Sequence, residues 1–202
     1  KVTIVAVTKT FPPSAVDAAV AAGIHDIGEN RVQELAAKIN QVTTKPRWHM
    51  IGHLQSNKVR DAVRMAEVIQ TVDSISLAER IGREAVAADK EISVLIQVNI
   101  GNESQKSGVA PDGTLDLARA VMAVKGIRLK GLMAIPPMTG ENEVRGYFRA
   151  MKKLSVVLTE VADDATEISM GMSGDFVIAI EEGATMVRLG SYLFGSRADA
   201  GR

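Results

Sequence analysis

The 202-residue sequence contains no cysteine, few aromatic residues and no excess of charge of either sign. Without cysteine the chain cannot form disulfides, thiolate-ligated zinc sites, iron–sulfur clusters or a thiol nucleophile. Its 24 Lys and Arg residues balance 24 Asp and Glu residues, so no net field attracts nucleic acid or an anionic membrane. We therefore expect no nucleic-acid partner, and the missing cysteines fit a reducing cytoplasm.

Long apolar runs are also missing. No stretch reaches the roughly 18 apolar residues of a membrane span, and no signal-peptide pattern opens the chain. We expect a cytoplasmic protein that does not act at a membrane. The sequence starts at Lys1 with a strand-like segment and not with Met, so we expect that residues before it are missing. A composition of 46% hydrophobic and 24% charged residues excludes a disordered or collagen-like chain.

Short β-branched apolar runs alternate with segments of helical spacing along the whole chain. The runs cover residues 2–7, 24–27, 48–51, 68–72, 94–100, 129–135, 167–170 and 186–189. They are apolar almost throughout, which is typical of a parallel sheet covered on both faces. Eight strand–helix units with right-handed crossovers can close as a (β/α)8 barrel, and we predict this α/β fold as a single domain over residues 1–202. An open, doubly wound sheet is the alternative.

The segments between the runs carry the helical signal. Apolar residues recur at i, i+3, i+4 and i+7, as at Val32, Leu35, Ala36 and Ile39. Ser76 and Glu79 have the spacing of a capping box, which predicts a helix that begins there.

A lysine follows the first run directly. Active sites of (β/α)8 barrels lie where the strands end, and the run 2–7 is followed by Thr8, Lys9 and Thr10. A lysine shielded from water at this point can form a Schiff base with a carbonyl compound. The alternative, which is more frequent for a single lysine, is an ammonium group that extends to the solvated rim.

Polar residues also follow the second and third runs. Asn30 lies in a polar cluster after the second run, where it is either a ligand contact or a helix cap. His49 and His53 are four residues apart in and after the third run. On an extended segment two such residues stand about 13 Å apart, so we predict no zinc site.

Small-residue turns follow the last two runs. Ser173 and Gly174 come after the seventh run, and Gly190 and Ser191 come after the eighth. Exposed backbone N–H groups at such turns bind phosphate, and these two loops are a common phosphate site in such barrels. The alternative interpretation is that both are ordinary strand-to-helix turns that bind no phosphate. Together with Lys9 on the adjoining strand, the turns favour a phosphorylated carbonyl ligand, and pyridoxal phosphate meets both requirements.

Several longer motifs carry a resemblance to a known family. They are VAVTKT (5–10), GENRVQE (28–34), WHMIGHLQSNK (48–58), KSG (106–108), GLM (131–133), MGMSGD (170–175) and VRLGSYLFG (187–195). From Val2 to about Arg197, the chain resembles the pyridoxal phosphate homeostasis protein family, also called YggS/PROSC. That family resembles the N-terminal barrel of alanine racemase.

The resemblance implies the site residues and their roles. Pyridoxal phosphate is expected on Lys9 as a Schiff base, with Arg188 facing the pyridine nitrogen. The resemblance also implies that serine and glycine residues of the last two turns hold the phosphate and that Asn30 and His49 lie near the ring. The predicted cofactor-binding residues are Lys9, Asn30, His49, Met172, Ser173, Arg188, Gly190 and Ser191.

The chain departs from the family pattern in three places. Arg31 stands where the family usually has an aromatic residue, and Gly174 where a polar residue is common. The helix that usually precedes the first strand is not part of this sequence, and we expect it among the missing residues before Lys1. For Arg188 itself, the alternative interpretation is a rim arginine paired with a carboxylate such as Glu181 or Glu182.

The implied function is that of a cofactor carrier. An arginine beside the pyridine nitrogen keeps that nitrogen unprotonated, which weakens the cofactor as an electron sink. Racemases add a catalytic tyrosine from a second domain, which we do not expect here. The resemblance therefore implies a monomeric protein without an established reaction, which binds, buffers and delivers pyridoxal phosphate to transient apo-enzyme partners. The alternatives are a racemase or another Schiff-base enzyme such as an aldolase, and a barrel for a different phosphate ester.

Overall fold

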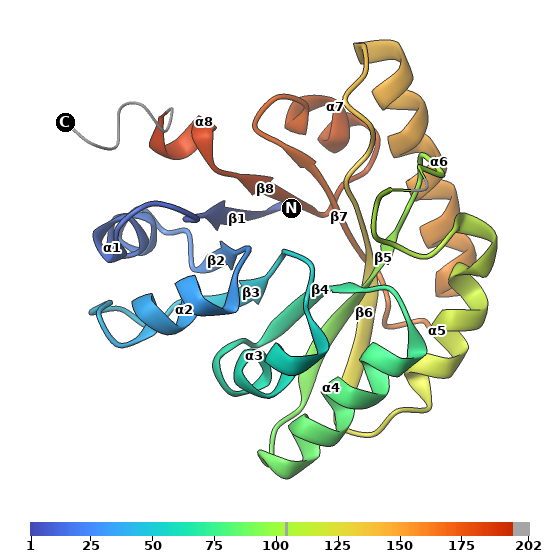
Figure 1. The fold of residues 1–202 in the computed structure, drawn as a ribbon. Helices are drawn as coiled ribbons and strands as arrows, with labels where there is room; N and C mark the ends of the chain where they lie inside the picture. The colour runs from blue at the N-terminus through green and yellow to red at the C-terminus, as the bar shows by residue number, and fades with distance from the viewer. Residues whose placement is uncertain (104, 196–202) are drawn as a thin grey trace.

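A computed structural model describes residues 1–103 and 105–195 and shows a closed barrel of parallel strands with helices around it (Figure 1). The strands are β1 (Thr3–Val7), β2 (Asp26–Glu29), β3 (Arg47–Met50), β4 (Val68–Val72), β5 (Ile92–Val98), β6 (Ile127–Ala134), β7 (Glu167–Met172) and β8 (Met186–Leu189). Each strand pairs with the next, and β8 pairs with β1 to close the barrel. The predicted (β/α)8 architecture is confirmed, and the open sheet is excluded.

Helices follow each strand on the outside of the barrel. They are α1 (Pro13–Ala21), α2 (Val32–Ile39), α3 (Val59–Met65), α4 (Ile75–Ala87), α5 (Thr114–Met122), α6 (Glu141–Thr159), α7 (Phe176–Glu181) and α8 (Ser191–Phe194). Two 3-10 turns, η1 (Ser56–Lys58) and η2 (Pro111–Gly113), precede α3 and α5. No helix in the described ranges is long and apolar enough to cross a membrane.

The start of α4 differs from the sequence prediction. The capping box at Ser76 and Glu79 is wrong, because the helix begins one residue before Ser76. Ser74 has the extended backbone of an N-cap residue, and its side chain makes no capping bond. The Ser76 hydroxyl instead donates a weak hydrogen bond to the Ser74 hydroxyl, at 3.4 Å.

The bounds of β2 also differ from its apolar run. The run suggested a strand over 24–27, whereas β2 extends from Asp26 to Glu29. The run includes Asp26 but stops before Gly28 and Glu29, whereas Ile24 and His25 precede the strand. In the structure the Asp26 carboxylate pairs with His49 and the buried Glu29 carboxylate pairs with Lys38, which allows both to lie in the sheet.

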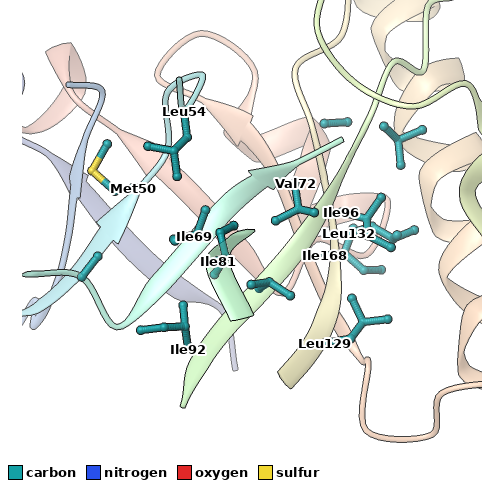
Figure 2. Packing of buried hydrophobic residues seen from close by; sticks show 14 of the residues in the cluster. Met50, Leu54, Ile69, Val72, Ile81, Ile92, Ile96, Leu129, Leu132 and Ile168 are labelled. Carbon is teal, nitrogen blue, oxygen red and sulfur yellow. The ribbon is translucent and has the colours of Figure 1, made fainter. Parts of the chain in front are cut away.

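The two faces of the barrel wall differ in polarity. Trp48, Met50, Ile69 and Ile168 belong to the hydrophobic cluster, part of which is drawn in Figure 2. Side chains alternate between the two faces of a strand. The intervening residues include buried polar side chains that face the barrel interior. These are His49 in β3, Gln70 in β4, Ser169 in β7 and Arg188 in β8.

Candidate functional site

A cavity of about 390 Å³ opens where β1, β2, β7 and β8 end. Seven of the eight predicted site residues line it: Lys9, Asn30, Met172, Ser173, Arg188, Gly190 and Ser191. Sequence reasoning missed its apolar wall, which includes Val7, Phe11, Ile51 and Ile135. Their positions at or just beyond the ends of apolar runs are the signal that could have identified them.

The amine of Lys9 has no partner in the parts of the chain that the structure describes. Lys9 is half-buried, and its backbone is fixed on both sides. The preceding Thr8 is fully buried, and its N–H donates to the carbonyl oxygen of Gly28 at 3.2 Å. The following Thr10 has a positive φ of 67°, and its N–H donates to Glu34 Oε2 at 3.1 Å. The backbone therefore presents a free amine at a defined point of the cavity.

A buried ion pair supports the strand end beneath Lys9. Lys38 Nζ lies 2.5 Å from Glu29 Oε1 and 2.5 Å from the carbonyl oxygen of Thr8. The Thr8 hydroxyl donates to the same Glu29 oxygen at 2.6 Å. Burial raises the pKa of Glu29, while Lys38 and Thr8 act in the opposite direction. Sequence reasoning missed Lys38, because its partners lie on two other elements.

The turn after β7 is tied to the turn after β8 through Ser173. Its Oγ accepts hydrogen bonds from the backbone N–H groups of Gly190, at 3.2 Å, and Tyr192, at 3.1 Å. Since the oxygen accepts both bonds, the hydroxyl hydrogen remains free to donate to a ligand. Asp175 Oδ1 accepts from the Met172 N–H at 2.6 Å and closes the first turn. Two turns with N–H groups and hydroxyls around one cavity are suited to bind an anion.

A glycine is needed just before this turn. Gly171 has a φ of +90°, and a Cβ at this position would lie 2.5 Å from the Cβ of Ala179 in α7. The missing side chain therefore allows α7 to pack against the end of β7. Gly174 is different, because a Cβ there would have open space around it.

Arg188 lies almost completely buried in β8, with three hydrogen bonds to the barrel wall. Nη1 donates to the carbonyl oxygen and the hydroxyl of Ser169 at 2.8 and 2.7 Å, and Nη2 donates to the carbonyl oxygen of Ala134 at 2.9 Å. Burial lowers the pKa of Arg188 to about 10, and the negative charge of Asp175 acts in the opposite direction. The guanidinium therefore stays charged at neutral pH. Of its five N–H donors, two remain for a ligand.

The rim alternative for this arginine is excluded. The carboxylates of Glu181 and Glu182 pair with Arg145 of α6, in each case at 2.8 Å. Arg188 is only 3% exposed.

His49 is the predicted site residue that the structure does not place in the cavity. It is fully buried, with Nε2 2.8 Å from Asp26 Oδ1 and Nδ1 2.9 Å from Gln70 Nε2. His53 instead lines a separate groove that also includes Arg31. Among the described residues, no group of acidic and histidine side chains could hold a metal ion.

The fold and the cavity define a class of protein: a (β/α)8 barrel with a lysine and two small-residue turns around one cavity at the rim. Residues 1–198 match the sequence model of the family described as "Alanine racemase, N-terminal domain". The pyridoxal phosphate homeostasis protein of Pseudomonas aeruginosa is 41% identical over 195 residues, which cover 96% of this chain and 84% of that protein. The chain belongs to the pyridoxal phosphate homeostasis protein family, as its motifs predicted.

Solved structures show the same architecture. PipY of Synechococcus elongatus, in a structure with PLP bound, matches with a TM-score of 0.87 and 34% identity over 96% of this chain and 92% of that chain. Alanine racemase of Clostridium difficile in complex with cycloserine matches with a TM-score of 0.81 and 16% identity. The match covers 98% of this chain and 56% of the racemase, and it shows a shared barrel fold.

Proposed function

We propose that this chain binds pyridoxal 5′-phosphate in the cavity and acts in the homeostasis of that cofactor by binding, buffering and delivering it. The observation that carries the proposal is the free amine of Lys9 in the same cavity as the Ser173 turn. The names of the relatives and the PLP-bound PipY structure support it. The proposal includes the single barrel domain, the cytoplasmic location and the monomeric state expected from the sequence.

The residues of the cavity fit the chemical groups of pyridoxal phosphate. The Lys9 amine can form a Schiff base with the aldehyde. The hydroxyls of Ser173 and Ser191, with neighbouring backbone N–H groups, can donate to the phosphate. The apolar side chains of Val7 and Ile51 offer surface for the flat ring. When bound, the cofactor supplies an electrophilic carbonyl and an electron sink.

Arg188 favours a carrier role over catalysis. Its two unused N–H groups can donate to the pyridine nitrogen, which then accepts a hydrogen bond and carries no proton. A guanidinium with a pKa of about 10 does not give up its proton to this nitrogen at neutral pH. The ring is then a weak electron sink, so amino acids bound there undergo little carbanion chemistry.

Neither tyrosine of the chain supplies a side-chain proton donor inside the cavity. The Tyr192 ring packs against Phe176, with ring centroids 4.8 Å apart. The Tyr147 hydroxyl donates to Glu143 on the surface of α6. This arrangement supports a protein that holds the cofactor for transfer to apo-enzymes.

Absorption spectroscopy tests the binding proposal. Purified chain mixed with pyridoxal phosphate should develop visible absorption that borohydride reduction removes, and peptide mass spectrometry should find the reduced adduct on Lys9. A protein that stays colourless would favour a different phosphate ester. Transfer is tested by mixing the loaded chain with a pyridoxal-phosphate-dependent apo-enzyme and following the recovery of that enzyme's activity. Steady turnover of alanine enantiomers by the loaded chain alone would support the enzyme alternative.

A further inference from the structure

A continuous row of hydrogen-bonded side chains crosses the barrel interior from β2 to β8. We call it the interior row; it consists of Asp26, His49, Gln70, Ser169 and Arg188. Its links are His49 Nε2 to Asp26 Oδ1 at 2.8 Å, His49 Nδ1 to Gln70 Nε2 at 2.9 Å, Ser169 Oγ to Gln70 Oε1 at 2.7 Å and Arg188 Nη1 to Ser169 Oγ at 2.7 Å. The row thus connects the start of β2 with the cavity.

In every hydrogen bond of the row, the donor lies on the side of Arg188 and the acceptor on the side of Asp26. A guanidinium can only donate, so Ser169 Oγ accepts from Arg188 and donates its own hydrogen to Gln70 Oε1. This fixes the Gln70 amide with its nitrogen toward His49, and a contact of 3.1 Å from the same nitrogen to Met186 Sδ fits this orientation. His49 Nδ1 is then the acceptor, and His49 carries its proton on Nε2, facing Asp26.

The charge of Asp26 completes the row at its far end. Burial alone would raise the pKa of Asp26, but the hydrogen bond from His49 and the charge of Arg47 hold it below its ordinary value. The carboxylate is therefore ionised at neutral pH and accepts the Nε2 hydrogen of His49. Each hydrogen-bonding atom that links the row has a partner with a compatible role.

A row of polar side chains is unusual in the interior of such a barrel. Branched apolar residues normally fill this space, because buried polar groups cost free energy unless they are fully hydrogen-bonded. His49, Gln70 and Ser169 are each fully buried. Among the described residues, the charged groups to which they are hydrogen-bonded are Asp26 and Arg188, and Arg188 lines the cavity.

We propose that His49, Gln70 and Ser169 are positioning residues, which fix the guanidinium of Arg188 so that its two unused N–H groups face the cavity. The inference rests on the proposed function, in which those groups meet the pyridine nitrogen. It also explains why His49, which the sequence places near the ring, lies below the cavity: it acts on the ligand through Gln70, Ser169 and Arg188.

Arginine side-chain NMR on the unloaded protein tests the positioning directly. In the parent, Arg188 should give two separate Nη signals with slowly exchanging hydrogens, and His49 should be the tautomer protonated on Nε2. Gln70→Leu and Ser169→Ala should each speed the exchange of the Arg188 Nη hydrogens by about five-fold, the effect of one typical net hydrogen bond. If Gln70→Leu does not fold, Ser169→Ala, which is the smaller change, tests the positioning of Arg188 on its own.

Thr71→Val is the matched control. Thr71 is the next residue of β4, is 1% exposed and loses one hydrogen bond, from its hydroxyl to the carbonyl oxygen of Gly52 at 2.9 Å. This bond lies outside the row, so the Arg188 signals should not change. Unchanged Arg188 signals in Ser169→Ala, an equal change in Thr71→Val, or a His49 protonated on Nδ1 would each overturn the proposal.

A second readout connects the row to the ligand. In Gln70→Leu or Ser169→Ala loaded with pyridoxal phosphate, the visible absorption maximum should shift relative to the parent, because the hydrogen bond to the ring nitrogen is less well held. Thr71→Val should keep the parent spectrum. If the row variants alter the Arg188 signals but the parent takes up no pyridoxal phosphate, the positioning of Arg188 stands and the proposed function fails. If the parent loads normally and the row variants show the parent signals and spectrum, the function stands and the positioning fails.

Discussion

The ammonium group of Lys38 lies 2.5 Å from the carbonyl oxygen of Thr8, directly before the lysine that we propose carries the cofactor. The same ammonium neutralises the buried carboxylate of Glu29, whose other oxygen has no hydrogen-bond partner within residues 1–103 and 105–195. A helix residue thus joins the ends of β1 and β2. The position of Lys9 depends on a charge pair that does not touch the ligand cavity.

Replacement of Lys38 should destabilise the fold strongly. Lys38→Met leaves the Glu29 carboxylate buried without its counter-charge, and removal of one partner of a buried pair costs about 3–5 kcal/mol. Urea denaturation should show this loss in the free energy of unfolding. The double variant Lys38→Met with Glu29→Gln should recover part of it, because no unpaired charge remains. A loss below about 1 kcal/mol in the single variant would mean that the pair does not support the strand end.

Lys9→Ala should abolish the covalent adduct with pyridoxal phosphate. The remaining cavity still offers the phosphate contacts, so weak noncovalent binding should persist. Borohydride reduction followed by peptide mass spectrometry measures the adduct. Lys58→Ala, in the neighbouring groove, is the control and should keep the parent level. An adduct on Lys58 or Lys106 would refute the assignment of Lys9.

The serine hydroxyls should matter for the phosphate and not for the ring. Each charge-assisted hydrogen bond contributes about 1.5–3 kcal/mol, so Ser173→Ala combined with Ser191→Ala should weaken the binding of pyridoxal phosphate far more than that of pyridoxal. Equilibrium dialysis with both ligands measures the difference. Of the two single variants, Ser173→Ala should weaken binding more than Ser191→Ala, because the Ser173 hydroxyl oxygen also accepts hydrogen bonds from the N–H groups of Gly190 and Tyr192. Equal losses for the two ligands would argue against a phosphate role.

Asp26 should contribute to stability in a pH-dependent way. Its pKa in the folded chain lies below the ordinary value of 3.8, so its contribution is present above pH 3.8 and is lost as the pH falls through the lower folded value. As the pH decreases through this range, the melting temperature of Asp26→Asn should therefore fall less steeply than that of the parent. Asp112→Asn changes an exposed carboxylate in a surface turn and is the control. The same dependence of the melting temperature on pH in the parent and in Asp26→Asn would contradict this expectation.

The sequence predicted the barrel because apolar β-branched runs and helical spacing are local signals. Position after a strand also indicated Lys9, Asn30 and the two small-residue turns of the cavity, because residues after the strands of such a barrel meet at one rim, and the family resemblance added Met172 and Arg188. The role of Gln70 was not predictable in this way. A glutamine inside the apolar run 68–72 is a visible anomaly, but its partners come from β3 and β7, and only the closed barrel brings these together.

The pairing of the first strand with the last has a consequence for how the chain folds and holds a ligand. Lys9 follows β1, and Ser191 follows β8, so the cavity is complete only after these two strands have paired. A ligand bound to both Lys9 and Ser191 would connect the two strands of this β1–β8 seam and slow their separation. At a free ligand concentration one hundred times the dissociation constant, such binding adds about 2.7 kcal/mol to the stability of the closed form. If pyridoxal phosphate binds as proposed, opening of the β1–β8 seam would therefore separate its two points of attachment and favour its release.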